Sequence, residues 1–189
     1  MESILKREIV VNKIACRIIG VISFIILTSL GAFVRIPLPF TPVPLTLQTF
    51  FVLLSGAMLG ANRGSLSQLI YLLLGITGLP IFANAGSGLI YLLGPTGGYV
   101  LGFILASFFI GKTIRYVDRK TFFSVFIFMC IGDLIILSSG IIWLKILFGY
   151  NFKKILLIGF LPFIPGDLLK IVVAAKIFLK IRARLERIF

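Results

Sequence analysis

Residues 64–111 read GSLSQLIYLLLGITGLPIFANAGSGLIYLLGPTGGYVLGFILASFFIG, a run of 48 residues without Lys, Arg, Asp or Glu. A helix of ~20 apolar residues crosses a bilayer core, so this run is longer than two spans and shorter than three. Leu79–Gly94, between the two spans, is uncharged yet rich in glycine. Irregular backbone at membrane depth is tolerated where protein or a cavity covers it, so we expect this segment to contribute to a binding site.

The whole chain has the composition of a membrane protein. Of its 189 residues, 59% are hydrophobic and only 13% are charged, and the mean hydropathy is +1.15. In a typical soluble domain about a quarter of the residues are charged. The composition therefore excludes a soluble enzyme, a disordered protein and a disulfide scaffold. We expect an all-α integral membrane protein, with residues 1–189 forming a single transmembrane domain.

Six transmembrane helices are expected from the apolar runs and their breaks. Four prolines within residues 37–44 favour an extended segment after the first helix. Thr46 can cap the second helix, and Asn62-Arg63-Gly64 predicts the turn that follows it. The sixth helix is expected to break at Pro162 and Pro165. The expected helices are 14–34, 46–59, 64–75, 99–114, 122–147 and the broken 155–181.

Basic residues predict the orientation. Lys and Arg number 19 against 6 Asp and Glu, a net charge of +13. They flank apolar runs, so the expected partner is membrane lipid with an anionic inner face and not nucleic acid. Fourteen fall on one side: four in the N-terminus (1–13) and the start of the first helix, one in the second turn, four in the connector (Lys112, Arg115, Arg119 and Lys120), and five in the tail (182–189) and the end of the sixth helix before it. Four fall on the other side. The excess predicts a multi-pass cell-membrane protein with both termini cytoplasmic.

Three charged residues fall well inside the expected spans and not near their cytoplasmic or outer ends: Asp133, Asp167 and Lys170. Such residues are costly in the bilayer and are usually paired or functional. Asp167 and Lys170 are three residues apart on one helix, so they form either a structural pair or the polar end of a ligand pocket. Asp133 has three interpretations: a protonated carboxyl, a partner of Lys145 across a bend, or part of the same cavity.

Several kinds of chemistry are not supported. With no His and with Cys16 and Cys130 in separate apolar runs, the sequence predicts no metal site. Residues 106–113 match a relaxed P-loop, but at the end of an apolar helix rather than after a strand, so we expect no ATP binding. The aspartates lack the motifs of intramembrane aspartyl proteases. We therefore expect a protein that is not an enzyme.

Four strings together resemble a known family. They are Arg35-Ile-Pro-Leu-Pro-Phe-Thr-Pro-Val-Pro-Leu-Thr-Leu-Gln-Thr, Gly78-Leu-Pro-Ile-Phe-Ala, Gly94-Pro-Thr-Gly-Gly-Tyr and Pro165-Gly-Asp-Leu-Leu-Lys. They closely resemble the BioY family, the biotin-specific S component of energy-coupling-factor (ECF) transporters, from about Ile14 to Ile181. The resemblance implies six helices, capture of biotin from the outer side, and no cofactor. It also implies a transmembrane T component and two ATP-binding-cassette ATPase subunits as partners, with ATP used only by those partners.

The resemblance and the residue chemistry together suggest a set of biotin contacts. Polar candidates are the Pro-Gly-Asp-x-x-Lys residues and amides from the outer side, and apolar candidates are aromatic rings near the glycine-rich segment. Arg35 either meets the biotin carboxylate or anchors the first helix at the interface. The candidate substrate-binding residues are Asp167, Lys170, Asn84, Phe82, Tyr91, Tyr99, Gln48, Arg35 and Asp133.

Two questions remain open from sequence. S components commonly dock through an Ala-xxx-Ala face on the first helix, and here the small residues four apart are Cys16 with Gly20 and Thr28 with Ala32. The alternative functions are a self-sufficient secondary carrier or channel with Asp133 as its coupling site, and an S component for another vitamin.

Overall fold

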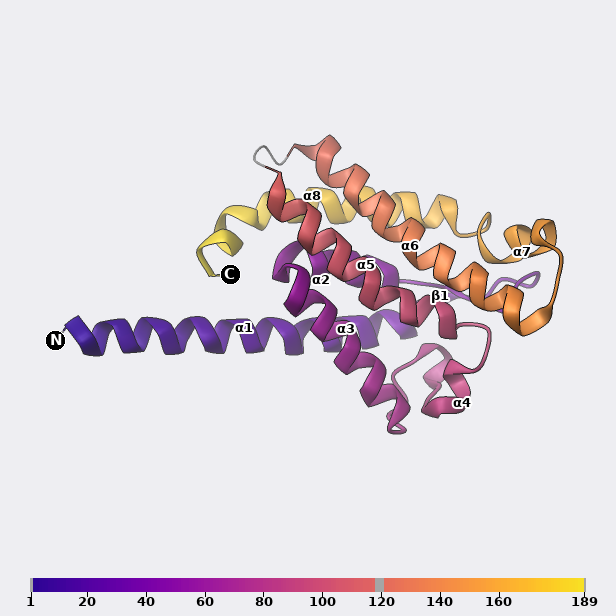
Figure 1. The fold of residues 1–189 in the computed structure, drawn as a ribbon, viewed down its shortest axis with the longest axis horizontal. Coiled ribbons are helices and arrows are strands. Elements are labelled where there is room, and N and C mark those ends of the chain that lie inside the picture. Colours follow the sequence, from indigo (N-terminus) through magenta and orange to yellow (C-terminus); the bar gives the residue numbers. More distant parts are fainter. Residues whose placement is uncertain (1, 118–120, 189) are drawn as a thin grey trace.

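The structure is a computed structural model that describes the backbone of residues 2–117 and 121–188 and the side chains of residues 13–117 and 121–182. It is a helical bundle with one short ribbon of two strands (Figure 1), which confirms the expected all-α class. The elements are α1 (Glu2–Phe33), β1 (Arg35–Ile36), β2 (Leu45–Thr46), α2 (Gln48–Leu59), α3 (Ala61–Ile76), the 3₁₀ helix η1 (Ala83–Ala85), α4 (Gly88–Leu92), α5 (Gly97–Tyr116), α6 (Phe122–Phe148), α7 (Phe152–Gly159) and α8 (Ile164–Ile188).

The expected six helices correspond to α1, α2, α3, α5, α6 and the broken pair α7–α8. Among the described residues, three helices are long and apolar enough to cross a membrane, or four if the pair α7–α8, bent by 48°, is one span. The other two are shorter: α2 has 12 residues and α3 has 16, or ~18 and ~24 Å at the rise of an α-helix. The bundle therefore combines full spans with two helices shorter than a bilayer core of ~30 Å.

The two ends of the bundle differ in character. The start of α1, the end of α8, the turn between α2 and α3, the end of α5 and the start of α6 lie at one end (Figure 1). The ribbon, α4 and α7 lie at the other (Figure 1). α5 packs against α6, α3 and α2, and α2 also contacts α1 and α8, so α2 and α5 form the centre of the bundle.

Small residues let α2, α3 and α5 approach closely. A Cβ on Gly64 would lie 2.6 Å from the Ser107 hydroxyl, and one on Gly56 would collide with the Ser107 carbonyl. The buried hydroxyls of Ser55 and Ser107 lie 2.9 Å apart, and the Gln68 amide donates to Ser55 at 3.1 Å. In a lipid bilayer the hydrophobic effect does not drive helices together, so close backbone packing and interhelical hydrogen bonds of this kind hold them in contact.

The structure corrects three local expectations. The chain turns at Gly60, with φ +80°, and Asn62–Gly64 belong to the first turn of α3. Glycine adopts a positive φ without a Cβ clash, so the sharp turn comes one residue after α2 and not at the polar triplet. The proline-rich segment is not simply extended, because β1 pairs with β2 in antiparallel register, Arg35 opposite Thr46. The main-chain N–H of Gln48 reaches the Thr46 hydroxyl at 3.4 Å, although the N-cap residue itself is Leu47.

The ends of the chain continue helices. α1 begins at Glu2 and α8 ends at Ile188, so the expected N-terminal segment 1–13 and tail 182–189 are not separate from the first and last helices. Lys112 and Arg115 lie in the last turns of α5, and the expected connector residues Arg119 and Lys120 lie outside the described residues. On α1, Thr28 and Ala32 are fully buried within the chain, so this pair faces the bundle and cannot form an outer docking face.

Candidate functional site

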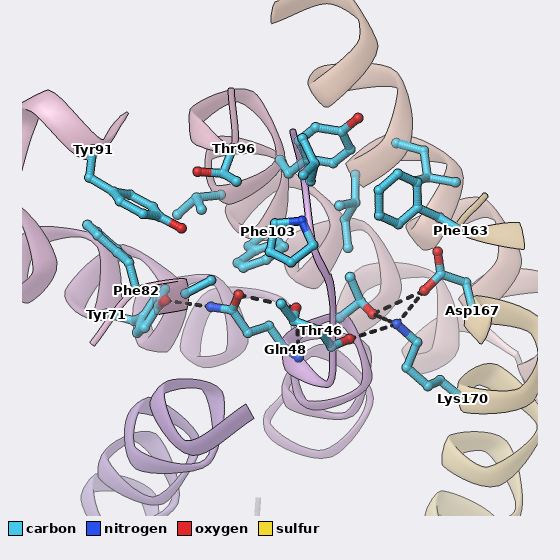
Figure 2. Close-up of a pocket in the computed structure, with 18 residues that line it drawn as sticks. Thr46, Gln48, Tyr71, Phe82, Tyr91, Thr96, Phe103, Phe163, Asp167 and Lys170 are labelled. Atoms are coloured by element: carbon cyan, nitrogen blue, oxygen red, sulfur yellow. Dashed lines mark hydrogen bonds and ion pairs between the residues drawn. The ribbon is translucent and has the colours of Figure 1, made fainter. Parts of the chain in front are cut away.

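A cavity opens among the ribbon, α2, α3, α5, α6, α8 and the segment before α5 (Figure 2). Ligand pockets combine apolar walls with a few polar groups, and this cavity has both features. Its lining residues are Val43, Pro44, Thr46, Gln48, Thr49, Tyr71, Phe82, Ala83, Tyr91, Thr96, Tyr99, Val100, Phe103, Ile136, Leu137, Phe163, Asp167 and Lys170.

One end of the cavity is charged. The Lys170 ammonium contacts a carboxylate oxygen of Asp167 at 2.5 Å and donates to the Thr49 hydroxyl at 2.6 Å and to the Thr46 carbonyl at 2.9 Å. The Thr49 hydroxyl donates to the same carboxylate oxygen, Asp167 Oδ1, at 3.3 Å. The side chains of Asp167 and Lys170 are only 3% and 11% exposed. Each charged group therefore depends on the opposite charge of the other to offset the cost of its burial.

The second oxygen of Asp167 is available to a ligand. Asp167 Oδ2 is buried and accepts no hydrogen bond from the described residues. The carboxylate lies in the first turn of α8, where the helix dipole stabilises negative charge. A buried anionic oxygen without a donor is costly, so this end of the cavity is suited to a ligand that brings an N–H or O–H group.

The opposite end of the cavity is aromatic (Figure 2). The ring of Phe82 stacks on Tyr91 with centroids 4.8 Å apart and meets the edge of Tyr71 at 5.5 Å. Burial raises the pKa of the Tyr91 phenol above its ordinary value, so this hydroxyl is a neutral donor at neutral pH. The wall offers apolar surface with polar tips to a ligand.

Glycines hold the rings of this wall in place. A Cβ on Gly75 would collide with the Phe82 ring, one on Gly86 with the Tyr91 ring, and one on Gly140 with the Tyr99 ring. Each glycine belongs to a different segment: the end of α3, the turn after η1 and the middle of α6. The backbone of these glycines therefore lies directly against the three aromatic rings.

Gln48 lies between the two ends (Figure 2). Its amide donates to the Tyr71 hydroxyl at 2.5 Å, and its carbonyl accepts from the Thr46 hydroxyl at 3.3 Å. The Tyr71 hydroxyl donates in turn to the Ile81 carbonyl at 3.2 Å. On the far side, the Tyr99 hydroxyl donates to the carbonyl of Gly159, where α7 ends. These bonds connect the lining helices to the segment after α3 and to the break between α7 and α8.

The family model described as the BioY family matches residues 6–187 of the chain. The chain belongs to the BioY family. It is 42% identical over 160 residues to the biotin transporter BioY of Thermotoga maritima, covering 84% of this chain and 91% of that protein. It is 42% identical over 150 residues to the probable biotin transporter BioY of Pyrococcus horikoshii, covering 78% and 84% of the two chains.

A solved structure of the same kind of protein has the same fold. The crystal structure of the S-component for biotin from an ECF-type ABC transporter matches with a TM-score of 0.85 and 27% identity, covering 91% of this chain and 93% of that chain. Together with the apolar helices, membership of the BioY family establishes this chain as a multi-pass membrane protein.

The structure brings six of the nine candidate residues of this BioY chain to the cavity. These six are Asp167, Lys170, Phe82, Tyr91, Tyr99 and Gln48. Arg35 is exposed on β1 and Asn84 is exposed on η1, and neither lines the cavity. Asn84 adopts φ 64° in the tight turn, so its position reflects the ability of Asn to take a left-handed conformation.

Asp133 is the third candidate residue outside the cavity lining. It is 5% exposed on α6, its Oδ1 has no hydrogen-bond partner among the described residues, and it interacts electrostatically with Asp167 and Lys170. Because α6 is one helix from Phe122 to Phe148, Asp133 and Lys145 are ~18 Å apart along its axis, which excludes a pair between them.

The other lining residues were not among the candidates, and Thr49, Tyr71 and Phe103 are examples. Thr49 ends the quoted string that begins at Arg35 and includes Gln48, so the string itself was a signal for it. Tyr71 and Phe103 sit inside apolar helices, where nothing local separates a ring that lines a cavity from a ring that packs in the core.

Proposed function

We propose that this chain is the biotin-binding S component of an ECF-type uptake transporter. The observation that carries the proposal is a single cavity with an Asp167–Lys170 pair at one end and stacked aromatic rings at the other. Biotin has a ureido group with two N–H donors and one carbonyl, an apolar thiophane ring and a carboxylate tail. Its mixture of polar and apolar groups is complementary to this lining.

In the proposed complex, Asp167 Oδ2 accepts a ureido N–H, because this oxygen is buried and has no donor among the described residues. Lys170, whose ammonium donates to Asp167, Thr49 and Thr46, holds this carboxylate in place and balances its charge. The thiophane ring packs against the aromatic wall around Phe82. The chain performs no catalysis in this proposal and uses no cofactor.

We also propose partners and an orientation. A transmembrane T component and two ATP-binding-cassette ATPase subunits supply the energy, and ATP is used only by them. Both termini are cytoplasmic, since fourteen Lys and Arg residues belong to the sequence segments assigned to the side of the termini and four to the segments assigned to the opposite side. The cavity then opens toward the outer side, next to the ribbon and the 79–94 segment.

Two measurements test the proposed function. Isothermal titration of the detergent-solubilised chain should give one biotin site per chain, and a chain tagged in its native cells should copurify with ATPase subunits. Saturable binding of another vitamin in place of biotin would assign a different substrate. Biotin uptake by this chain alone in vesicles, abolished by Asp133→Asn and driven by an ion gradient, would instead indicate a secondary carrier.

The proposed outer face predicts accessible positions. Ala85 and Pro42 are exposed on the segments that border the cavity. Cysteines placed there, in a background with Cys16 and Cys130 replaced by Ala, are expected to react with an impermeant thiol reagent from outside the cell. Biotin should slow both reactions several-fold, because a filled cavity holds its bordering segments closed. Reaction from the cytoplasmic side alone would reverse the orientation, and rates independent of biotin would exclude closure.

A further inference from the structure

A groove on the outside of the bundle, between α1 and α3, shares no lining residue with the biotin cavity. Its volume is about 680 Å³. Its walls are branched aliphatic side chains at turn spacing on both helices: Ile18, Ile22 and Ile26 of α1 and Leu66, Ile70 and Leu74 of α3. The only polar residues that line it are Arg17 and Arg63.

The position of the two arginines gives the groove a direction. Arg17 and Arg63 precede all the aliphatic residues on their helices, so both lie at one end of the groove, the end with the chain termini (Figure 1). From Arg63 to Leu74 the groove follows α3 for ~16 Å, at 1.5 Å per residue. This is about half of a hydrocarbon core of ~30 Å, the depth of one lipid leaflet.

A second hollow, the basic pocket, adjoins the charged end of the groove and shares Arg63 with it. Lys112, Arg115 and Asn62 line this pocket, and α3 begins beside it at Ala61. Arg17 and Arg115 both lie close enough to repel the Arg63 guanidinium. The Nε of Arg17 is buried and has no hydrogen-bond partner among the described residues. Arg guanidinium groups gathered at a helix N-terminus suit a phosphate, which they bind by paired hydrogen bonds.

We infer that the groove binds one anionic phospholipid. An acyl chain lies along the aliphatic residues of α1 and α3, the phosphate sits between Arg17 and Arg63, and the rest of the headgroup enters the basic pocket. In the orientation proposed above, this is a lipid of the inner leaflet. A zwitterionic lipid fits less well, because its ammonium group would enter a pocket that already holds Lys112 and Arg115.

The test uses the full chain purified in mild detergent and observed by native mass spectrometry. Phosphatidylglycerol and phosphatidylcholine with identical acyl chains are added separately, at equal concentration. We expect a single phosphatidylglycerol adduct retained at least tenfold more than phosphatidylcholine. Equal retention of the two lipids would overturn the inference. The absence of any retained lipid would also overturn it and would indicate that a partner subunit, and not a lipid, covers the groove. Displacement of the lipid by millimolar inorganic phosphate alone would show a free-anion site and also overturn it.

Variants separate the two halves of the site. The double variant Arg17→Gln, Arg63→Gln should reduce phosphatidylglycerol retention about tenfold, and Ile70→Trp should do the same by filling the groove while keeping both charges. The matched control is Lys153→Gln, Lys154→Gln, which removes two cations at the other end of the bundle and should change nothing. Biotin affinity, measured on each variant, reports that the bundle is folded. Equal lipid retention in a folded groove variant and the control would place the lipid elsewhere.

Discussion

Asp167→Asn is expected to lower biotin affinity by about 100-fold, or ~2.7 kcal/mol. The change removes the negative charge that compensates Lys170, whose side chain is 11% exposed and whose ammonium lies 2.5 Å from the carboxylate. It also replaces a charged acceptor by an amide, and charge-assisted hydrogen bonds are roughly twice as strong as neutral ones. Isothermal titration of the purified variant with biotin measures the loss of affinity, and its thermal unfolding without ligand measures the effect of leaving Lys170 uncompensated.

Asp133→Asn is the matched control. Asp133 and Asp167 are the two acidic residues within helices whose side chains the structure describes, and the same substitution neutralises either one. Asp133 is as buried as Asp167 but does not line the cavity. We expect its biotin affinity to change less than threefold. If both variants lose affinity equally, the effect comes from buried charge in general, and the assignment of Asp167 to the ligand is wrong. If a folded Asp167→Asn protein binds biotin normally, the charged end of the cavity does not contact the ligand.

The fold was largely predictable because lipid imposes simple rules on sequence. Uncharged runs mark the helices, and Pro162 correctly predicted the break between α7 and α8. The expectation for Pro165 was wrong, because this proline lies in the first turn of α8, where its missing N–H leaves no helical hydrogen bond unmade. The turn between α2 and α3 was placed wrongly because Asn62-Arg63-Gly64 has typical turn chemistry. The actual turn at Gly60 depends on how closely α3 and α5 approach, since a Cβ on Gly111 would collide with the backbone of Ala61.

The site was predictable only in part, because the residues that form it are far apart in the sequence. Asp167 and Lys170 were conspicuous because charges are rare in membrane helices. Their partner Thr49 is 118 residues from Asp167 in sequence, and a threonine in an apolar helix gives no local sign of that contact. Similarly, Asn84 was a reasonable amide candidate, but the turn that contains it leaves it exposed. Which residues meet across a bundle depends on packing between helices and not on local pattern.

The string Gly94-Pro-Thr-Gly-Gly-Tyr gains a physical explanation from the structure. The carbonyl of Gly94 accepts from the Trp143 indole at 2.9 Å, and a Cβ on Gly97 would collide with the Leu92 carbonyl. Gly98 lies directly against α6: a Cβ there would collide with the Cβ of Trp143 and come within 2.7 Å of the Ser139 carbonyl. The string thus closes the turn into α5 and brings its last residue, Tyr99, to the cavity.

Gly98→Val is therefore expected to destabilise the protein by about 3 kcal/mol, at the upper end for overpacked cores. The added side chain meets backbone and Cβ atoms of α6, which no rotamer change can move, so α5 and α6 must separate where Tyr99 enters the cavity. Gly98→Ala should have a smaller effect of the same sign. Leu105→Val, a β-branched substitution at an exposed position of α5, is the matched control and should unfold at the temperature of the unsubstituted chain. Thermal unfolding in detergent, followed by biotin titration of the folded fraction, makes the comparison. A Gly98→Val protein as stable as the control would show that α5 and α6 do not pack as closely as the structure places them.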